Sequence, residues 1–140
     1  MLRTYDSRKV LLSLGSHSVT GYANGSFVTI EPNGDGVIKK VGADGEIIRS
    51  IDPDGTSNLT ITVLQQSPTV AFCQKMYDKD RVDGSGVFPV LIKDLKGGLV
   101  FSCQDAWVTT PMTREFANEA PDREISIHCG DVEYDGENEE

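Results

Sequence analysis

The sequence has few of the residues that mark disulfide-rich, membrane-spanning or metal-binding proteins. Its 140 residues include three cysteines, too few for the disulfide framework of a small secreted scaffold. The longest apolar stretches, Val10–Leu12 and Val87–Ile92, are far shorter than the roughly 20 residues that a membrane helix needs. The two histidines, His17 and His128, form no metal-spaced pair with a cysteine or a carboxylate. We therefore expect no bound metal, no cofactor and no membrane insertion.

Basic residues are also scarce, with 13 lysines and arginines against 22 aspartates and glutamates and a formal net charge of −9. The cationic surface that grips phosphate backbones or an anionic membrane is missing, which disfavours ordinary nucleic-acid binding. Residues 131–140 hold six acids and no base, a composition typical of a solvated tail and, less often, of a docking element. We expect one domain over residues 1–130, followed by an acidic tail over residues 131–140.

The first residues do not follow the pattern of a signal peptide, because charged side chains precede only a brief apolar stretch without a small-residue cleavage site. Cys73, Cys103 and Cys129 are odd in number and widely spaced, which fits a reducing compartment. We expect three reduced, buried thiols in a protein that stays in the cytoplasm where it is made.

Alternation with a period of two predicts β-strands along most of the chain. Leu59, Ile61 and Val63 alternate with threonines, and residues 125–129 repeat this pattern near the C-terminus. Further strands are expected over residues 10–14, 19–22, 27–31, 37–41, 46–51, 86–95 and 99–101, with another that begins at 106 and ends near 111. The dipeptide Asn24-Gly25 predicts a hairpin turn between residues 19–22 and 27–31, which gives an opening meander.

A second hairpin is expected over about residues 37–51, with its turn at Gly42-Ala43-Asp44-Gly45. Its arms carry Lys39, Lys40, Glu46 and Arg49, so they offer fewer core positions than a central hairpin does. We expect these arms to project from the body of the domain.

One stretch predicts a helix, since Ser67 suits the N-cap, Pro68 suits the first helical position, and Gly84 suits the end. Pro89 cannot donate to a strand ladder, so its apolar strand should lie at an edge, contain a bulge, or be buried against another element. Together these elements predict a mainly β fold, an antiparallel β-sandwich or barrel with one flanking α-helix.

The chemical motifs do not support catalysis. Residues 31–36 imitate the first half of a calcium loop, but Gly42 stands where the bidentate glutamate is needed, so a plain turn is the better interpretation. A nucleophile at Cys103 or Cys129, with His17 or His128 as base, has no geometric support in the sequence. We predict that the protein is not an enzyme.

Four segments together resemble the tail tube proteins of contractile-tailed bacteriophages and related prophages. They are Leu2-Arg3-Thr4-Tyr5-Asp6 with Lys9-Val10, Gly42-Ala43-Asp44-Gly45-Glu46, Gly86-Val87-Phe88-Pro89 running to Lys93-Asp94-Leu95, and Ala106-Trp107-Val108. The similarity spans most of residues 1–135. Each segment alone has little specificity, and their order and spacing carry the resemblance.

The resemblance implies a sandwich or barrel similar to the haemolysin-coregulated tube protein of type VI secretion. Such subunits form hexameric rings, which stack into a hollow tube inside a contractile sheath. The implied partners are further copies of the chain, the tail sheath protein, the tape-measure protein and the baseplate. DNA would pass through the tube without sequence-specific binding. The implied location is the virion, with assembly in the host cytoplasm.

The resemblance also implies which residues join the subunits. Contact with the next ring is expected from Asp44, Gly45, Glu46 and Arg49, and contact with neighbouring subunits from Leu2, Arg3 and Tyr5. Two other functions stay open. A tail terminator or baseplate component would share the β architecture and stop at a single ring. A small β-barrel binding protein would remain monomeric and hold a ligand in its interior.

Overall fold

The fold is that of a computed structural model, which describes residues 10–22, 25, 28–94, 100–111 and 113–135. The strands are β1 (Val10–Leu14), β2 (His17–Ser18), β3 (Val28–Pro32), β4 (Val37–Val41), β5 (Ile47–Ile51), β6 (Ser57–Leu64), β7 (Phe88–Asp94), β8 (Val100–Val108), β9 (Asp122–Cys129) and β10 (Val132–Asp135), and the helix is α1 (Pro68–Asp83). Every strand pairing among the described residues is antiparallel. The predicted mainly β fold with one flanking helix is confirmed.

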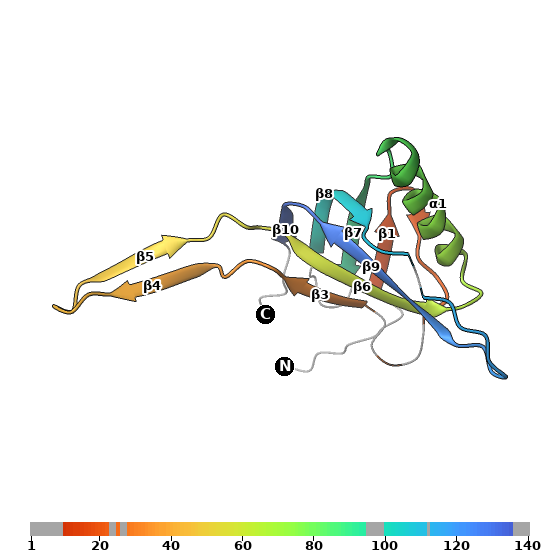
Figure 1. Cartoon of the computed structure of the whole chain (residues 1–140), viewed down its shortest axis with the longest axis horizontal. Coiled ribbons are helices and arrows are strands. Elements are labelled where there is room, and N and C mark those ends of the chain that lie inside the picture. The colour runs from red at the N-terminus through yellow and green to blue at the C-terminus, as the bar shows by residue number, and fades with distance from the viewer. Residues whose placement is uncertain (1–9, 23–24, 26–27, 95–99, 112, 136–140) are drawn as a thin grey trace.

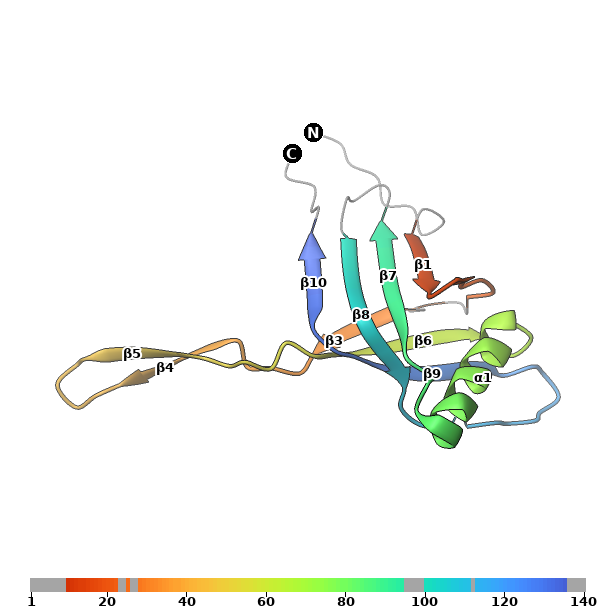
Figure 2. The ribbon, with the colours of Figure 1, turned by 90° about the horizontal axis from the view of Figure 1, so that it is seen from above.

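One eight-stranded sheet forms the body, in the order β2-β1-β7-β8-β9-β6-β3, with β10 also paired to β8. Figure 2 shows its two halves, β1-β7-β8-β10 and β9-β6-β3, crossing at a steep angle. Strand β8 turns the corner. Its residues 100–103 pair with β7 and β10, Ala106 pairs with both β7 and β9, and residues 107–108 pair with β9. The register between β7 and β8 shifts between Phe88 and Val90, as expected where a bulge bends a strand.

The core lies between the two halves of the sheet and the helix. Its fully buried side chains alternate along the strands, as the sequence predicts for Leu59, Ile61 and Val63 and for residues 125–129. The largest of these side chains is Phe101, in the part of β8 that precedes the corner. The hydrophobic effect therefore holds the two halves together at the bend.

Helix α1 begins and ends where its caps predict. The Ser67 side chain accepts from the Thr69 N–H, Pro68 occupies the first turn, and Gly84 has a left-handed φ of 75°. The helix buries Thr69 and Cys73 against the core and lies over one end of the bent sheet (Figure 1). In the described part of the chain, no helix is both long and apolar enough to span a bilayer.

The opening meander is only partly formed. Strand β2 pairs with β1, whereas β3 pairs with β6, and Tyr22 makes an isolated bridge with Val63 of β6. The prediction of a hairpin between residues 19–22 and 27–31 is therefore wrong, and Asn24 lies outside the described residues. The edge of β6 is a better partner for β3, because this pairing packs Val28 and Ile30 against the core.

Two further predictions change with the long-range pairing. Residues 106–108 are the end of β8 rather than the start of a new strand. The strand that contains Pro89 lies between β1 and β8, so it is not an edge strand. Of the alternatives open for Pro89, the bulge is the one found, since the proline sits within the register shift at the corner.

The acidic tail expected over residues 131–140 begins inside the sheet. Strand β10 continues the ladder along β8, and Val132 packs against the core. The Gly130 N–H donates to the Asp105 carbonyl at 2.8 Å, which holds the chain as it bends from β9 into β10. Residues 100–103 of β8 offer an edge opposite β7, which explains why part of this acidic segment is ordered into a strand.

The three cysteines are free and buried, as predicted. Burial raises the pKa of the Cys73 and Cys129 thiols to about 12. A reactive cysteine needs the opposite shift, because the thiolate is the nucleophile. The environment of these two thiols therefore disfavours the nucleophilic role considered for Cys129.

Candidate assembly surfaces

The β4–β5 hairpin is a two-stranded sheet of its own that extends away from the body (Figure 1). All ten of its strand residues are exposed. Six of them are aliphatic, with exposed fractions between 52% and 72%: Val37, Ile38, Val41, Ile47, Ile48 and Ile51. Apolar side chains gathered on an exposed arm indicate a surface that another protein covers.

The register distributes charge over both faces of this hairpin. Lys39 lies directly opposite Arg49, and Lys40 lies opposite Ile48 on the other face. The pairs Val37–Ile51 and Val41–Ile47 flank the two cations on their face. Like charges directly opposite each other destabilise an isolated hairpin, so these cations favour an anionic partner.

The turn of the hairpin positions the predicted contact residues. The Gly42 N–H donates to the Glu46 carbonyl at 2.8 Å, and the Asp44 carboxylate accepts from the Glu46 N–H at 3.1 Å. Gly45 has a φ of +88°, a conformation that favours glycine. Asp44 and Gly45 therefore shape the turn at residues 42–46, here called the tip of the hairpin. The Arg49 side chain lies on the paired strands β4 and β5, here called the shaft.

The remaining predicted contact residues, Leu2, Arg3 and Tyr5 of the N-terminal arm, lie outside the described residues. The structure brings Asp44, Gly45, Glu46 and Arg49 together on one hairpin.

The root of the hairpin is tied by two aspartates whose role the sequence did not reveal. The Asp52 carboxylate accepts from the Asp35 and Asp54 N–H groups, both at 2.9 Å. The Asp54 carboxylate accepts from the Thr56 N–H and hydroxyl. The backbone N–H of Asp52 donates to the Gly36 carbonyl at 2.7 Å. This bond joins the segment before β4 to the segment after β5, which are the two legs of the hairpin. The turn predicted at residues 31–36 and the segment that follows β5 thus form one joint that sets the direction of the hairpin.

This joint should loosen in acid. The hydrogen bonds from Asp35 and Asp54 hold the pKa of Asp52 below its ordinary value of 3.8. Because the pKa of Asp52 is lower in the folded state than in the unfolded state, the ionised carboxylate stabilises the joint, and this contribution is fully present above pH about 4. That stabilisation is lost as the pH falls through the folded pKa, below 3.8. We expect amide exchange at Asp35 and Asp54 to accelerate below pH about 4, measured by NMR against Asp52→Asn, in which this acid-dependent step should disappear.

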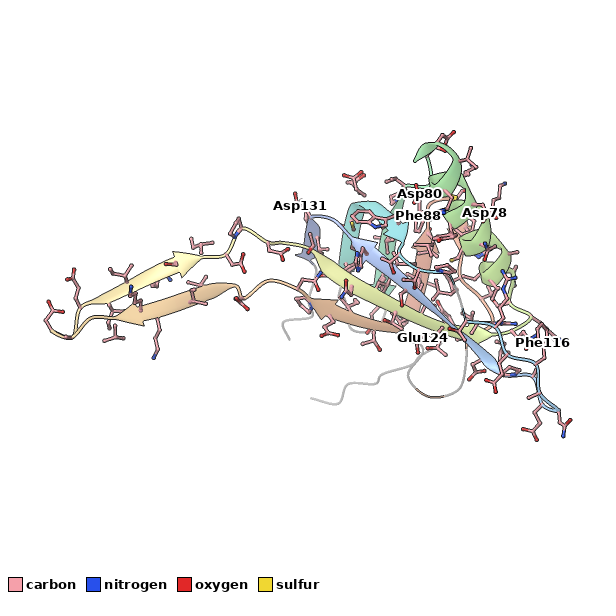
Figure 3. The ribbon with its side chains drawn as sticks, in the orientation of Figure 1. Asp78, Asp80, Phe88, Phe116, Glu124 and Asp131 are labelled. Atoms are coloured by element: carbon pink, nitrogen blue, oxygen red, sulfur yellow. The ribbon has the colours of Figure 1, made fainter. Side chains whose placement is uncertain are left out.

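A second surface lies at the other end of the molecule, in residues 113–121 of the connection between β8 and β9, here called the 113–121 loop. Figure 3 shows Phe116 at the end of the long axis opposite the hairpin. The Arg123 side chain is only 5% exposed, and its guanidinium donates to the Thr113 carbonyl at 3.0 Å and lies 6.0 Å from the centre of the Phe116 ring. Arg114 donates to the Gln74 side chain at 2.8 Å, which ties the same loop to α1.

Sequence reasoning missed this loop. Its signal was Arg123, a charged residue in phase with the buried residues Ile125 and Ile127. A cation at an inward-facing position of a strand indicates that something beyond the strand must satisfy it.

The body also has unpaired strand edges. Strands β2 and β3 are the two ends of the strand order, so each pairs on one side only among the described residues. An unpaired edge is a template for a strand of another chain. These edges are candidate contacts between neighbouring subunits.

The histidines have structural partners. The Nε2 atom of His17 lies 2.9 Å from the Thr69 hydroxyl, and its ring stacks on Phe72 at 4.8 Å. His128 packs edge-on against Trp107 at 6.0 Å. Within the described ranges, no group of three His, Cys, Asp or Glu side chains could hold a metal ion.

Comparison with known proteins agrees with this geometry. A curated relative, structural protein ORF10 of Pseudomonas phage KPP10, is 26% identical over 115 residues, which are 80% of this chain and 66% of that protein. The chain thus spans just under two thirds of this relative. The fold resembles a terminator of the sheath and tube of the PVC extracellular contractile injection system (TM-score 0.69, 12% identity, 96% of this chain and 99% of that one). It also resembles the tube-terminating cap of the anti-feeding prophage, with a TM-score of 0.67 and 12% identity over 97% of this chain and 93% of that one.

A third solved structure, the PVC sheath-tube complex in its extended state, matches with a TM-score of 0.63 and 11% identity over 95% of this chain and 92% of that one. These likenesses show the fold. Membership is shown by a family model that matches residues 11–135. That family is structural, which confirms the prediction that the protein is not an enzyme. The chain belongs to the family of the bacteriophage PhiTE tail tube protein.

Proposed function

We propose that the protein is the subunit of a phage tail tube and that its hexameric rings stack head to tail into a hollow conduit. The observation that carries this proposal is the β4–β5 hairpin, whose exposed aliphatic and cationic side chains project from a body that already has its own core. Membership of a tail tube family supports the same function. In a stack of rings, the exposed apolar side chains of this arm would be covered by the next ring.

Ring closure is proposed to use the unpaired edges of the sheet. Pairing between β3 of one subunit and an edge of its neighbour would join the sheets into a continuous barrel around the bore and remove the exposed edges. The N-terminal arm, with Leu2, Arg3 and Tyr5, is proposed to contact the neighbouring subunits.

Stacking is proposed to use the hairpin. Its strands of five residues each extend about 17 Å, so the hairpin projects well beyond the body of its own subunit. Asp44, Gly45 and Glu46 at the tip, with Arg49 on the shaft, are the proposed contacts between rings. Because the hairpin and the surface that it meets are different, the contact is head to tail and can repeat without limit.

The net charge of −9 suits a conduit for DNA, since an acidic wall does not hold a phosphate backbone. The proposed partners are further copies of this chain, a contractile sheath, the tape-measure protein and the baseplate. The sheath is supported by a similar fold in a sheath-tube complex. The proposed location is the virion, after assembly in the host cytoplasm.

Tail terminator is a second candidate, because two of the similar folds are a tube-terminating cap and a sheath/tube terminator. A terminator ring would close the end of a tube and would not stack on itself. The family model favours the tube subunit.

Size-exclusion chromatography with light scattering, followed by negative-stain electron microscopy of concentrated fractions, separates these functions. The tube proposal predicts hollow tubes built of rings. Single rings that never stack would favour the terminator, and a strict monomer at every concentration would contradict both.

Gly45→Val should stop tube growth while leaving the fold intact. A valine at a φ of +88° costs about 1–3 kcal/mol of backbone strain, which distorts the tip. An added Cβ meets no atom within 4 Å, so no steric clash contributes to this cost. Gly84→Val is the matched control, since Gly84 also has a positive φ and open space but ends α1. The thermal midpoint and sedimentation of both variants are the measurements. Normal tubes from Gly45→Val would contradict the role of the tip.

A further inference from the structure

The hairpin and the 113–121 loop lie at opposite ends of the long axis of the molecule, as both ribbon views show (Figures 1 and 2). In a head-to-tail stack, the leading end of one copy meets the trailing end of the next. We propose that the 113–121 loop, with the first residues of β9, is the surface of a second copy that receives the β4–β5 hairpin. This inference rests on the proposed function and names the partner surface that stacking requires.

The charges of the two ends are complementary. The shaft of the hairpin carries Lys39, Lys40 and Arg49, all exposed, on a chain that is otherwise strongly acidic. The receiving end exposes four acids, which are Glu115, Glu119, Asp122 and Glu124. Its exposed base, Arg114, is already engaged with Gln74 of α1. Opposite charges at the two ends favour the stacking orientation and disfavour contact between two identical ends.

The apolar surfaces are complementary as well. Phe116 is 83% exposed on the loop, and Leu64, which lies opposite Asp122 in the register of β6 and β9, is 49% exposed. Phe116 and Leu64 can contact the exposed valine and isoleucine pairs of the hairpin, while the acids around them face the two cations between those pairs. Exposed aromatic side chains are typical anchors of protein interfaces.

The receiving end is also incomplete in a single chain. Arg123 is buried, and its Nε atom has no hydrogen-bond partner among the described residues. A buried cationic donor without an acceptor is costly. Because the Nε atom is enclosed by its own chain, the carboxylates of Asp44 and Glu46 at the hairpin tip can reach it only if the loop moves on docking.

Charge reversal at each end tests this contact. The hairpin variant carries Lys39→Glu with Arg49→Glu, and the receiver variant carries Glu115→Lys with Glu119→Lys. All four side chains are exposed, so both variants should fold, and the hairpin variant keeps like charges opposite each other as in the native chain. Each variant alone should form about tenfold less tube mass than the native protein, because like charges then face each other across the contact. Sedimentation and electron microscopy measure the tube mass.

The decisive sample is the equal mixture of the two variants. Rings of the hairpin variant and of the receiver variant can alternate, because the reversed hairpin meets the reversed receiver and the native hairpin meets the native receiver. The mixture should regain tubes to within about twofold of the native protein, as expected when attraction across the interface is restored. A control with Asp83→Lys, an exposed acid at the end of α1 whose carboxylate accepts from the Ser85 N–H and not from a group of the loop, should assemble normally.

The outcomes separate this inference from the proposed function. If the native protein forms no tubes, the proposed function fails. If the hairpin variant fails and the receiver variant assembles normally, the function stands and the receiving surface is wrong. If both variants fail and their mixture also fails, the two ends do not meet. A photo-crosslinker in place of Phe116 gives an independent test in assembled tubes, and crosslinks that map outside residues 37–51 of another copy would overturn the inference.

Discussion

Phe101→Ala is expected to lower the free energy of unfolding by about 3–5 kcal/mol, the usual cost of emptying the site of a buried phenylalanine. Phe101 is the largest fully buried side chain, and it lies in β8 opposite Ile92 of β7. The core of the bend cannot collapse easily around the lost ring, because strands on both sides of β8 fix the backbone. Urea denaturation monitored by far-ultraviolet circular dichroism gives the change.

Phe116→Ala is the matched control, since it removes the same side chain from a position that is 83% exposed. The loss should stay below about 1 kcal/mol, the size of an exposed cation–π contact with Arg123. If both variants lost the same stability, the core would not be centred on the bend. Phe116→Ala should act instead on assembly, since Phe116 belongs to the proposed receiving surface.

Gly34→Ala is expected to prevent tube formation by displacing the hairpin. A Cβ added to Gly34 would meet the backbone carbonyl oxygen of Asp54, far inside the contact distance of any real Cβ atom. The two legs of the root must then separate, which breaks the hydrogen bonds through Asp52 that set the direction of the hairpin. The cost is about 1–3 kcal/mol, typical of overpacking, and it falls on the joint rather than on the core.

Gly55→Ala tests the same joint without the clash, because its added Cβ lies 3.4 Å from the Asp131 carboxylate, an ordinary contact. It should assemble like the native protein. Electron microscopy of both variants at equal concentration gives the tube content, and trypsin cleavage at Lys39 and Lys40 reports the state of the hairpin. Normal tubes from Gly34→Ala would show that the direction of the hairpin does not matter for stacking.

Local features of the sequence determined most of the elements. The alternation of Leu59, Ile61 and Val63 set which face of β6 is buried, and Ser67 with Gly84 set the ends of α1. The turn at Asp44-Gly45 and the charged arms beside it identified the hairpin as exposed. These features depend on neighbours a few residues apart, so a single sequence is enough to reveal them.

Only the tertiary structure decided which strands meet and what they bring together. Strand β3 pairs with β6 and not with the segment that precedes it in sequence. Strand β8 bends and joins the two halves of the sheet, and β10 places part of the acidic segment in the ladder beside β8. The Asp52 joint and the Arg123 loop also depend on segments 10 or more residues apart. Their partners are chosen by long-range burial and by the edges that remain unpaired, and local patterns carry no information about either.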